Sequence, residues 1–187
     1  MKKILILLLG IITLLIFPTS VLAVEDIVVN EHRVEIYVQE DGVYRFTHQL
    51  DVTFQSPHYG IYVNIPQEYE MEWVLEDGTI SKRRYVFPLS DFNISGPNEF
   101  ERSREGVQLR LGEAGVYVSG QQQYSYSYIM NTKDLRLDGR QRFYLNLLGD
   151  QWAIPTDKVS FIIYFPQDMS DKTIEFYSGR YGVDTPA

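Results

Sequence analysis

The stretch Arg142–Pro155, RFYLNLLGDQWAIP, decides the fold predicted for this chain. Its first half, Phe143–Leu148, is a mostly apolar run that ends at Gly149. Trp152 and Pro155 then close the connection to the next segment. A short apolar run bounded by breakers is typical of a buried strand. We expect most of the earlier strands to pair with this one or to pack on it.

The strands that precede it show the two-residue period of a sheet with one wet face. Apolar residues alternate with polar ones over residues 34–38, and Asp41-Gly42 is a favoured tight-turn pair. A longer strand follows, and strict alternation over its eleven residues predicts one buried and one solvated face. The face expected to be buried carries Tyr44, Phe46, His48, Leu50, Val52 and Phe54.

Further short strands are predicted over residues 58–66, 69–73, 82–87, 107–111, 123–130 and 173–177. Asp77-Gly78 joins two of them, so that Glu70 and Glu72 can face Lys82–Arg84. The run 159–166 is nearly all apolar and predicts a central strand covered on both sides. Residues 88–106 are predicted to be loop, with at most a short strand at 92–94.

This pattern predicts an all-β fold, an antiparallel β-sandwich of the immunoglobulin-like or jelly-roll-like kind with nine or ten short strands. The 14 Tyr and 10 Phe support it, because aromatic side chains suit a half-buried pleated surface. No linker or internal repeat divides residues 24–187, which are therefore expected to form one domain.

Residues 1–23 are predicted to be a secretory signal peptide. Lys2 and Lys3 precede an apolar run from Ile4 to Phe17, and small residues ending at Ala23 form a cleavage site. The alternative is an uncleaved membrane anchor, because the apolar run is nearly long enough to span a bilayer. In both cases the rest of the chain is exported, to the extracellular face of the membrane or into the medium.

Charge and cysteine content exclude several classes of function. The net charge of −8 becomes −10 without the leader, and such a surface is repelled by nucleic-acid phosphates and anionic headgroups. We therefore expect no nucleic-acid partner. Cysteine is absent, which excludes disulfides, thiol nucleophiles, thiolate metal sites and the lipid-bearing cysteine of a lipoprotein.

The sequence contains no known catalytic or metal-binding motif, and we predict no catalytic residue, metal or cofactor. His48, on the apolar face of its strand, is interpreted as a buried histidine rather than a catalytic one. Tyr124, Tyr126 and Tyr128 are interpreted as core, although an exposed row could stack on sugar rings. Glu68–Glu72 alternate on one strand face, which favours a solvated, salt-bridged surface over a calcium site.

The candidate ligand or interaction residues are Trp152, Asn146, His58 and Tyr62. In the structural interpretation, Trp152 fills the end of the core and Asn146 bonds exposed backbone. In the functional one, they form the floor of a recognition groove beside His58 and Tyr62. A pair of glycosidase-type carboxylates is a further hypothesis, since their separation is a three-dimensional quantity.

Three segments together resemble the N-terminal region of a bacterial predicted-membrane-protein family, domain of unknown function 2207. They are His58–Pro66, Leu109–Gly112 and the run Phe143–Trp152, which is the most specific. The resemblance covers most of residues 30–166. It implies an exported β-rich domain followed by transmembrane helices, which would lie beyond Ala187 in a longer protein, or else a freestanding exported member. The family pattern has glutamate at the position of His48 and arginine at that of Val63.

The sequence therefore favours a non-enzymatic binding or interaction module at the bacterial surface, tethered to the membrane. Its partner would be a protein or an envelope glycan. The alternative is a carbohydrate-binding or carbohydrate-active envelope domain that uses aromatic stacking and a carboxylate. A third possibility is an assembly domain that binds another subunit.

Overall fold

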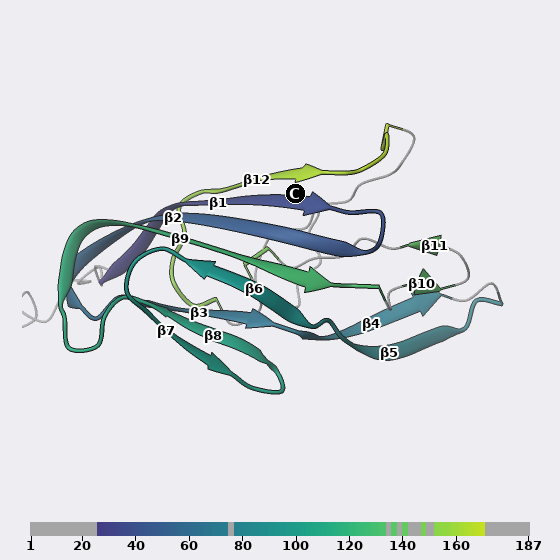
Figure 1. Ribbon diagram of the computed structural model, residues 1–187, viewed down its shortest axis with the longest axis horizontal. Coiled ribbons are helices and arrows are strands. Elements are labelled where there is room, and N and C mark those ends of the chain that lie inside the picture. Colours follow the sequence, from purple (N-terminus) through teal and green to yellow (C-terminus); the bar gives the residue numbers. More distant parts are fainter. Residues whose placement is uncertain are drawn as a thin grey trace, which may run out of the picture.

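The computed structural model describes residues 26–74, 77–133, 136–137, 140–141, 147–148 and 152–170. These residues contain ten strands of five residues or more, two strands of two residues, and no helix. The strands form two facing layers with buried apolar side chains between them (Figure 1). The predicted all-β sandwich of nine or ten short strands is confirmed.

The first layer is a five-stranded sheet in the order β12-β1-β2-β9-β6. Its central strand β2, of 16 residues, pairs along most of its length with β1 and β9. All pairs are antiparallel except β1–β12, which is parallel. The inner side chains of β2 from Tyr44 to Phe54 are buried, which confirms the alternation predicted there. The strands are β1 (Ile27–Val38), β2 (Val43–His58), β6 (Leu89–Ile94), β9 (Val118–Asn131) and β12 (Val159–Tyr164).

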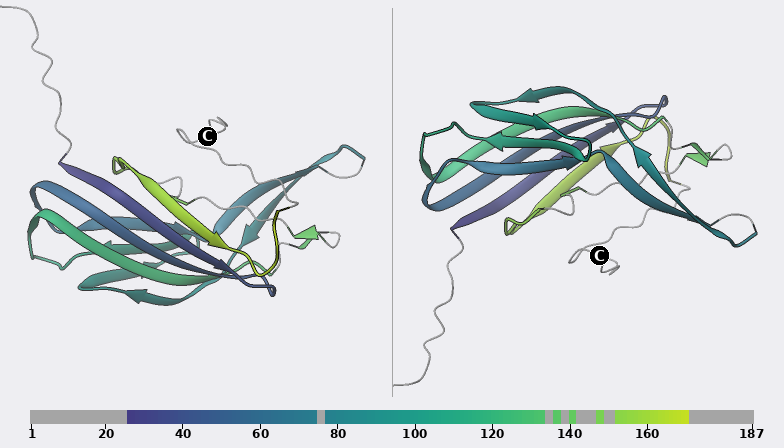
Figure 2. Two further views of the ribbon diagram at one scale, coloured as in Figure 1. Left: turned by 90° about the horizontal axis from the view of Figure 1, so that it is seen from above. Right: turned by 90° about the horizontal axis from the view of Figure 1, so that it is seen from below.

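The second layer is a three-stranded sheet in the order β3-β8-β7, formed by Ile61–Pro66, Gly106–Leu111 and Asn98–Arg102. After β3 the chain continues into a hairpin of β4 (Glu68–Val74) and β5 (Ile80–Val86). This hairpin extends beyond the two layers (Figure 2). In it Glu70 pairs with Arg84 and Glu72 with Lys82, so the predicted match of acidic and basic strands is confirmed. The two-residue strands are β10 (Arg136–Leu137) and β11 (Arg140–Gln141).

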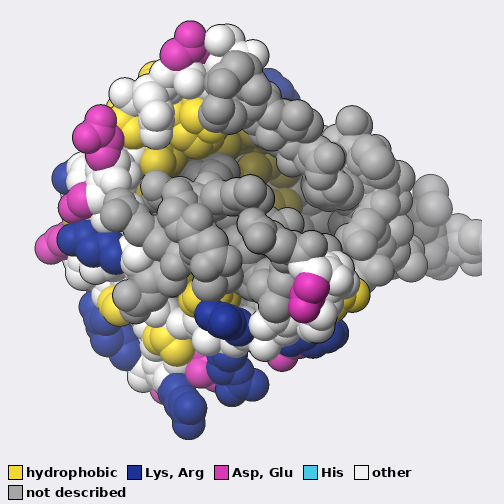
Figure 3. Space-filling model, turned by 90° about the vertical axis from the view of Figure 1, so that its right-hand side faces the viewer, with side chains coloured by type: hydrophobic (Ala, Val, Ile, Leu, Met, Phe, Trp, Pro, Cys, Tyr) yellow, Lys and Arg dark blue, Asp and Glu magenta, His cyan; other side chains and the backbone are white. Residues whose placement is uncertain are grey.

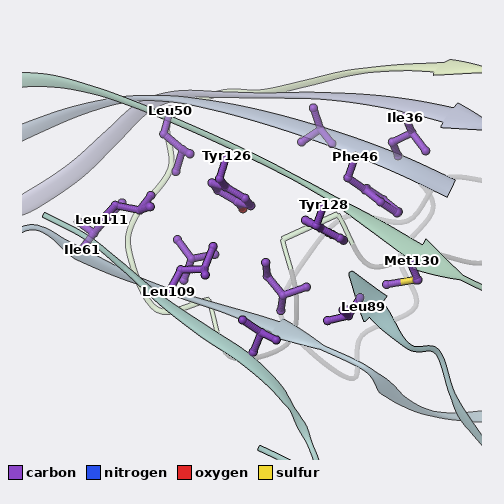
Figure 4. Close-up of a cluster of buried hydrophobic side chains, with 14 of the residues drawn as sticks. Ile36, Phe46, Leu50, Ile61, Leu89, Leu109, Leu111, Tyr126, Tyr128 and Met130 are labelled. Carbon is purple, nitrogen blue, oxygen red and sulfur yellow. The ribbon is translucent and has the colours of Figure 1, made fainter. Parts of the chain in front are cut away.

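The core lies between the two sheets. Leu50 and Tyr126 point from the large sheet toward Ile61 and Leu109 of the small one (Figure 4). Viewed from the right-hand end of Figure 1, apolar side chains gather in the hollow between the layers, with charged ones around the rim (Figure 3). Burying one side chain of this size stabilises the fold by about 1.5–3 kcal/mol. The core therefore fixes which face of each strand is left for solvent and ligands.

The loop predicted over residues 88–106 is wrong for most of its length, because β6 and β7 lie there, although the short strand allowed at 92–94 is confirmed as part of β6. Both are outermost strands of their sheets in the described part of the chain. Every residue of β7 is exposed, so the apolar alternation that identifies a strand in sequence is missing.

The run 159–166 does form a strand, but its predicted central, covered position is wrong. Within the described residues β12 pairs only with β1 and lies at the edge of the large sheet. Ile162 is 52% exposed, and Tyr164 stacks on Tyr37 at the surface. An apolar run shows that a segment favours a strand, but the position of the strand in the sheet depends on its pairing partner.

Several predictions fall outside the described residues. These are the signal peptide over residues 1–23, the strand at 173–177, and most of the stretch 142–155, including Asn146. Among the described residues, β2 and β9 have the central positions in the large sheet that the sequence suggested for that stretch.

Candidate functional site

The outer face of the small sheet carries two rows of polar side chains. Strands β3 and β8 bury alternate residues such as Val63 and Leu109, which leaves the residues between them on the outer surface. The antiparallel register aligns these residues across the three strands. One row is Tyr62, Arg110 and Glu99, and the other is Asn64, Gln108 and Glu101.

Each row contains one short polar contact. The Arg110 guanidinium donates a hydrogen bond from Nη2 to Glu99 Oε1 at 2.6 Å, and its side chain is only 12% exposed. Gln108 donates from Nε2 to Asn64 Oδ1 at 2.9 Å. Tyr62, by contrast, is 54% exposed beside Arg110. The two contacts hold the polar groups in place and leave the tyrosine ring open to solvent.

Two adjoining grooves follow these rows. The first has a volume of about 460 Å³ and the second about 320 Å³. Glu101 and Gln108 line both, so the two form one continuous depression along β8. The groove offers an aromatic ring, amide donors and acceptors, and carboxylates, which can fix a ligand through ring contacts and hydrogen bonds. The remaining lining residues are Phe100 in the first groove and Ile65, Pro66, Ser103, Glu105, Gly106 and Val107 in the second.

Beyond the Tyr62 end of this groove, two chain segments cross closely at Gly60 and Gly112. A Cβ atom on Gly60 would lie 2.0 Å from the Leu111 carbonyl oxygen, and one on Gly112 would lie 2.5 Å from the Tyr59 carbonyl oxygen. Both glycines also have a positive φ, of 96° and 143°. Glycine is therefore needed at each position for two reasons: a side chain would not fit, and the backbone conformation disfavours other residues.

Next to this crossing lies an exposed pair of tyrosines. The rings of Tyr59 and Tyr117 stack with centroids 4.1 Å apart, although they are 43% and 61% exposed. A hydrogen bond between the two side chains raises the pKa of Tyr59. The connections β2–β3 and β8–β9, which carry the pair, turn at the same end of the sandwich (Figure 1).

A second polar cluster lies inside the large sheet. His32 of β1 and His48 of β2 are buried, and His32 Nε2 lies 2.9 Å from His48 Nδ1, so one ring donates to the other. His48 stacks on Tyr126 with centroids 4.4 Å apart, and Trp152 packs on His32 at 5.5 Å. Trp152 is itself held by a hydrogen bond from its Nε1 to Thr156 Oγ1 at 2.9 Å.

Burial keeps this histidine pair neutral. Loss of solvation lowers the pKa of His32 to about 4 and the pKa of His48 well below its ordinary value, with repulsion from His32 as a further cause for His48. His32 Nδ1 and His48 Nε2 have no hydrogen-bond partner in the described part of the chain. Two buried imidazoles of this kind cannot bind a charged ligand from solvent, so the pair is a structural feature of the core.

The matching protein family is described as "Predicted membrane protein (DUF2207) N-terminal domain", and the match covers residues 28–186. The chain belongs to this family. The resemblance seen in the sequence is thus confirmed, and the match reaches beyond residues 30–166, to residue 186 of this chain. In the residues that the structure describes, no helix is long and apolar enough to cross a membrane. The same residues contain no cluster of three or more His, Asp or Glu side chains that could hold a metal ion.

The solved structures that resemble this DUF2207 domain do so only distantly. An M1 zinc metallopeptidase from Deinococcus radiodurans is 11% identical, with a TM-score of 0.33, over 57% of this chain and 20% of that one. A two-domain M1 zinc metallopeptidase, the E323A mutant bound to L-arginine, has a TM-score of 0.37 at 11% identity. The match covers 74% of this chain and 32% of that one. A putative protease from Parabacteroides distasonis has a TM-score of 0.28 at 12% identity, over 57% of this chain and 23% of that one.

These similarities are too weak to carry an argument about activity. The chain spans between a fifth and a third of the length of those longer proteins. None of the curated proteins compared with the sequence matches it. The chemistry of this DUF2207 domain must therefore be argued from its own residues.

The structure places the predicted site residues of the DUF2207 domain in three separate surroundings. Trp152 packs on His32, whereas His58 lies at the end of β2 within hydrogen-bond distance of Ser56 and near Phe54. Tyr62 lines the outer groove. No hydrogen bond or ring contact joins these three residues in the described part of the chain, and Asn146 lies outside it. Whether any of the four binds a ligand stays a prediction.

Sequence reasoning missed Arg110, Glu99 and the Tyr59–Tyr117 pair. A signal for the pair exists, because Gly60 directly precedes and Gly112 directly follows a run of strand-forming residues. No sequence pattern shows that these two glycines face each other. The same holds for Arg110 and Glu99, which are aligned only by the register of β7 on β8. The predicted core role of His48, Tyr126 and Tyr128 is confirmed by their burial.

Proposed function

We propose that this domain is a non-enzymatic binding module on the outer surface of a bacterial membrane, and that the outer face of its small sheet is the binding surface. The single observation that carries the proposal is the continuous groove of Tyr62, Gln108 and Glu101 on that face. The apolar leader of residues 4–17 and the family description of a membrane protein support the location.

The groove suits binding better than it suits catalysis. Its one arginine is already paired with Glu99, so no free cation remains at that position to stabilise a developing negative charge. Its amides, carboxylates and exposed Tyr62 ring can make many moderate contacts along an extended ligand. Such a surface recognises a polymer or a protein segment presented outside the cell.

The test is binding to purified cell-envelope material. The secreted chain, labelled at its amino terminus, is mixed with washed envelopes and sedimented, and the bound fraction is measured. We expect the unmodified protein to sediment with the envelopes and the Tyr62→Ala/Gln108→Ala variant to lose most of its binding.

The matched control is Tyr164→Ala/Gln49→Ala, which removes the same two side-chain types from the outer face of the large sheet. This control should sediment like the unmodified protein. Equal loss in both variants, or no binding by the unmodified protein, would contradict the proposal. Circular dichroism of each variant checks that the sheet content is unchanged.

A further inference from the structure

The outer groove has features that define the chemistry of its ligand, and this inference rests on the binding function proposed above. The groove follows β8 from Gly106 to Arg110, which is about 14 Å at the rise of an antiparallel strand. The Tyr59–Tyr117 pair lies just past its far end. A site this long and open at the surface fits a chain-like ligand rather than a single small molecule.

The charges in the groove exclude acidic ligands. Arg110 is neutralised by Glu99 at 2.6 Å. Glu101 and Glu105 line the groove and form no ion pair in the described structure. The groove therefore carries excess negative charge, in a chain whose net charge is already −8. A polyanion would be repelled, whereas a neutral or amino-bearing chain would not.

The hydrogen-bonding groups in the groove match hydroxyl groups. After Gln108 donates to Asn64, the Asn64 amide nitrogen can still donate and the Gln108 oxygen can still accept. Glu101 adds an acceptor next to them. A hydroxyl both donates and accepts, so it can pair with either kind of group without leaving a partner unsatisfied.

The aromatic groups supply flat apolar surfaces at one end of the groove. Tyr62 is 54% exposed, and Tyr117, at 61% exposed, is held by stacking on the Tyr59 ring with centroids 4.1 Å apart. A pre-positioned ring loses little conformational freedom on binding. Sugar rings present a flat C–H face that packs on such rings, while their edges carry hydroxyls.

We infer that the outer groove and the Tyr59–Tyr117 pair together bind a linear, non-acidic glycan. The rings of Tyr62, Tyr59 and Tyr117 stack on sugar faces, and Asn64, Gln108 and Glu101 bond the hydroxyls. An extended protein segment fits less well, because such segments add mainly to a strand edge through backbone hydrogen bonds, and this groove lies on a sheet face.

The experiment is isothermal titration of the secreted chain with four soluble hexasaccharides. The probes are cellohexaose, chitohexaose, its fully deacetylated form, and hexagalacturonate as the acidic member. We expect binding of at least one non-acidic probe and none of hexagalacturonate. Tyr117→Ala and Tyr62→Ala should each weaken binding by about tenfold, the loss of one aromatic stacking contact.

Tyr164→Ala is the matched control, because Tyr164 also belongs to an exposed stacked pair, with Tyr37 at 4.4 Å. Its affinity should stay within about twofold of the unmodified protein, since the change is distant from the groove and surface changes elsewhere are nearly neutral. Tyr59→Phe keeps the ring and should retain binding, which separates loss of stacking from loss of folding. Glu101→Gln/Glu105→Gln should weaken binding of the deacetylated probe more than that of cellohexaose.

The inference is overturned if no hexasaccharide binds, if hexagalacturonate binds as tightly as the others, or if Tyr164→Ala weakens binding as much as Tyr117→Ala. If envelope sedimentation still depends on Tyr62 and Gln108 while no glycan binds, the inference fails but the binding function stands. If neither assay depends on these residues, both fail.

Discussion

Two polar pairs lie on opposite sides of the packed core: His32 with His48 inside the large sheet, and Arg110 with Glu99 on the outer face of the small sheet. The histidines are almost fully buried, and each has a ring nitrogen without a partner in the described residues. The arginine and glutamate form an ion pair at 2.6 Å, and the Glu99 side chain is 57% exposed. The two pairs therefore differ more in their exposure to water than in their hydrogen-bond distances, which are 2.9 Å and 2.6 Å.

The difference shows where this domain can carry recognition chemistry. A buried pair that is not fully hydrogen-bonded must remain neutral, because an unpaired charge in the core is costly. Groups at the surface can be charged and can exchange water for a ligand at low cost. The core pair makes the stability of the fold depend on pH, whereas the outer pair orders side chains on a face that a ligand can reach.

The largest effect on stability is expected in β8, whose residues alternate between the buried face and the outer face. Leu109→Ala removes a side chain with no exposed surface and should lower the free energy of unfolding by about 3–5 kcal/mol. Its neighbour Gln108 lies on the outer face, and Gln108→Ala should change it by less than about 0.5 kcal/mol. Urea denaturation of both variants provides the measurement. Similar losses in the two would contradict the assignment of faces.

Lowering the pH should destabilise the buried pair. The folded-state pKa of His32, about 4, lies below its ordinary value of 6.5. Between these values the unfolded chain binds more protons, so the free energy of unfolding falls as the pH falls. The loss between pH 7 and pH 5 should be about 2 kcal/mol from His32 alone. Urea denaturation at several pH values measures it.

The control for this pH effect is His58→Gln, because His58 lies outside the buried pair. The stability of this variant should fall with pH as it does in the unmodified protein. His48→Leu should reduce this pH dependence. Glu31, whose pKa lies at about 2 because Arg33 and Lys158 bond it, loses its contribution only below pH 4.5, outside this window. A stability that stays flat from pH 7 to pH 5 would show that the pair is not buried as described.

Breaking the outer ion pair should cost less. Arg110→Met keeps the packing of the side-chain stem but removes the guanidinium, and it should lower the free energy of unfolding by about 1 kcal/mol or less. Glu99 then returns to water, so no buried charge is left behind. A loss above about 3 kcal/mol on urea denaturation would show that the pair is as buried as the histidines.

The smallest effect is expected in the projecting hairpin. Lys82 and Glu72 form an ion pair although their side chains are 61% and 53% exposed. Lys82→Ala should change the thermal midpoint by no more than the equivalent of about 0.5 kcal/mol, and added salt should reduce even that. A larger shift would mean that the hairpin packs on something else in solution.

The alternation of β2 shows how far sequence reasoning reached. The inner row from Tyr44 to Phe54 could be predicted because a two-residue period leaves only one way to bury it. The same reasoning failed for β7, where every side chain is exposed and no period exists. It also misplaced β12, because an apolar composition does not reveal that a strand pairs with β1 alone among the described strands.

The candidate site could be predicted only in part. Tyr62 was found because it lies in a recognisable strand, and its neighbours were missed because they come from sequence positions far away. Arg110 is 48 positions from Tyr62, and Glu99 reaches Arg110 only through the β7–β8 register. Trp152 was predicted to lie beside Tyr62 or to fill the core, and its contact with His32 depends on the pairing of residues 155–158 with β1.

Local patterns were enough to predict the alternating strands such as β2, the buried face of each, and the family, because these depend on alternation and motifs that lie within one segment. Three contacts are visible only in the folded chain: Gly60 meets Gly112, two histidines share one hydrogen bond, and Tyr62, Arg110 and Glu99 form one row. Those contacts depend on the pairing and register of strands, which are set by the packing of the whole core and not by any single segment.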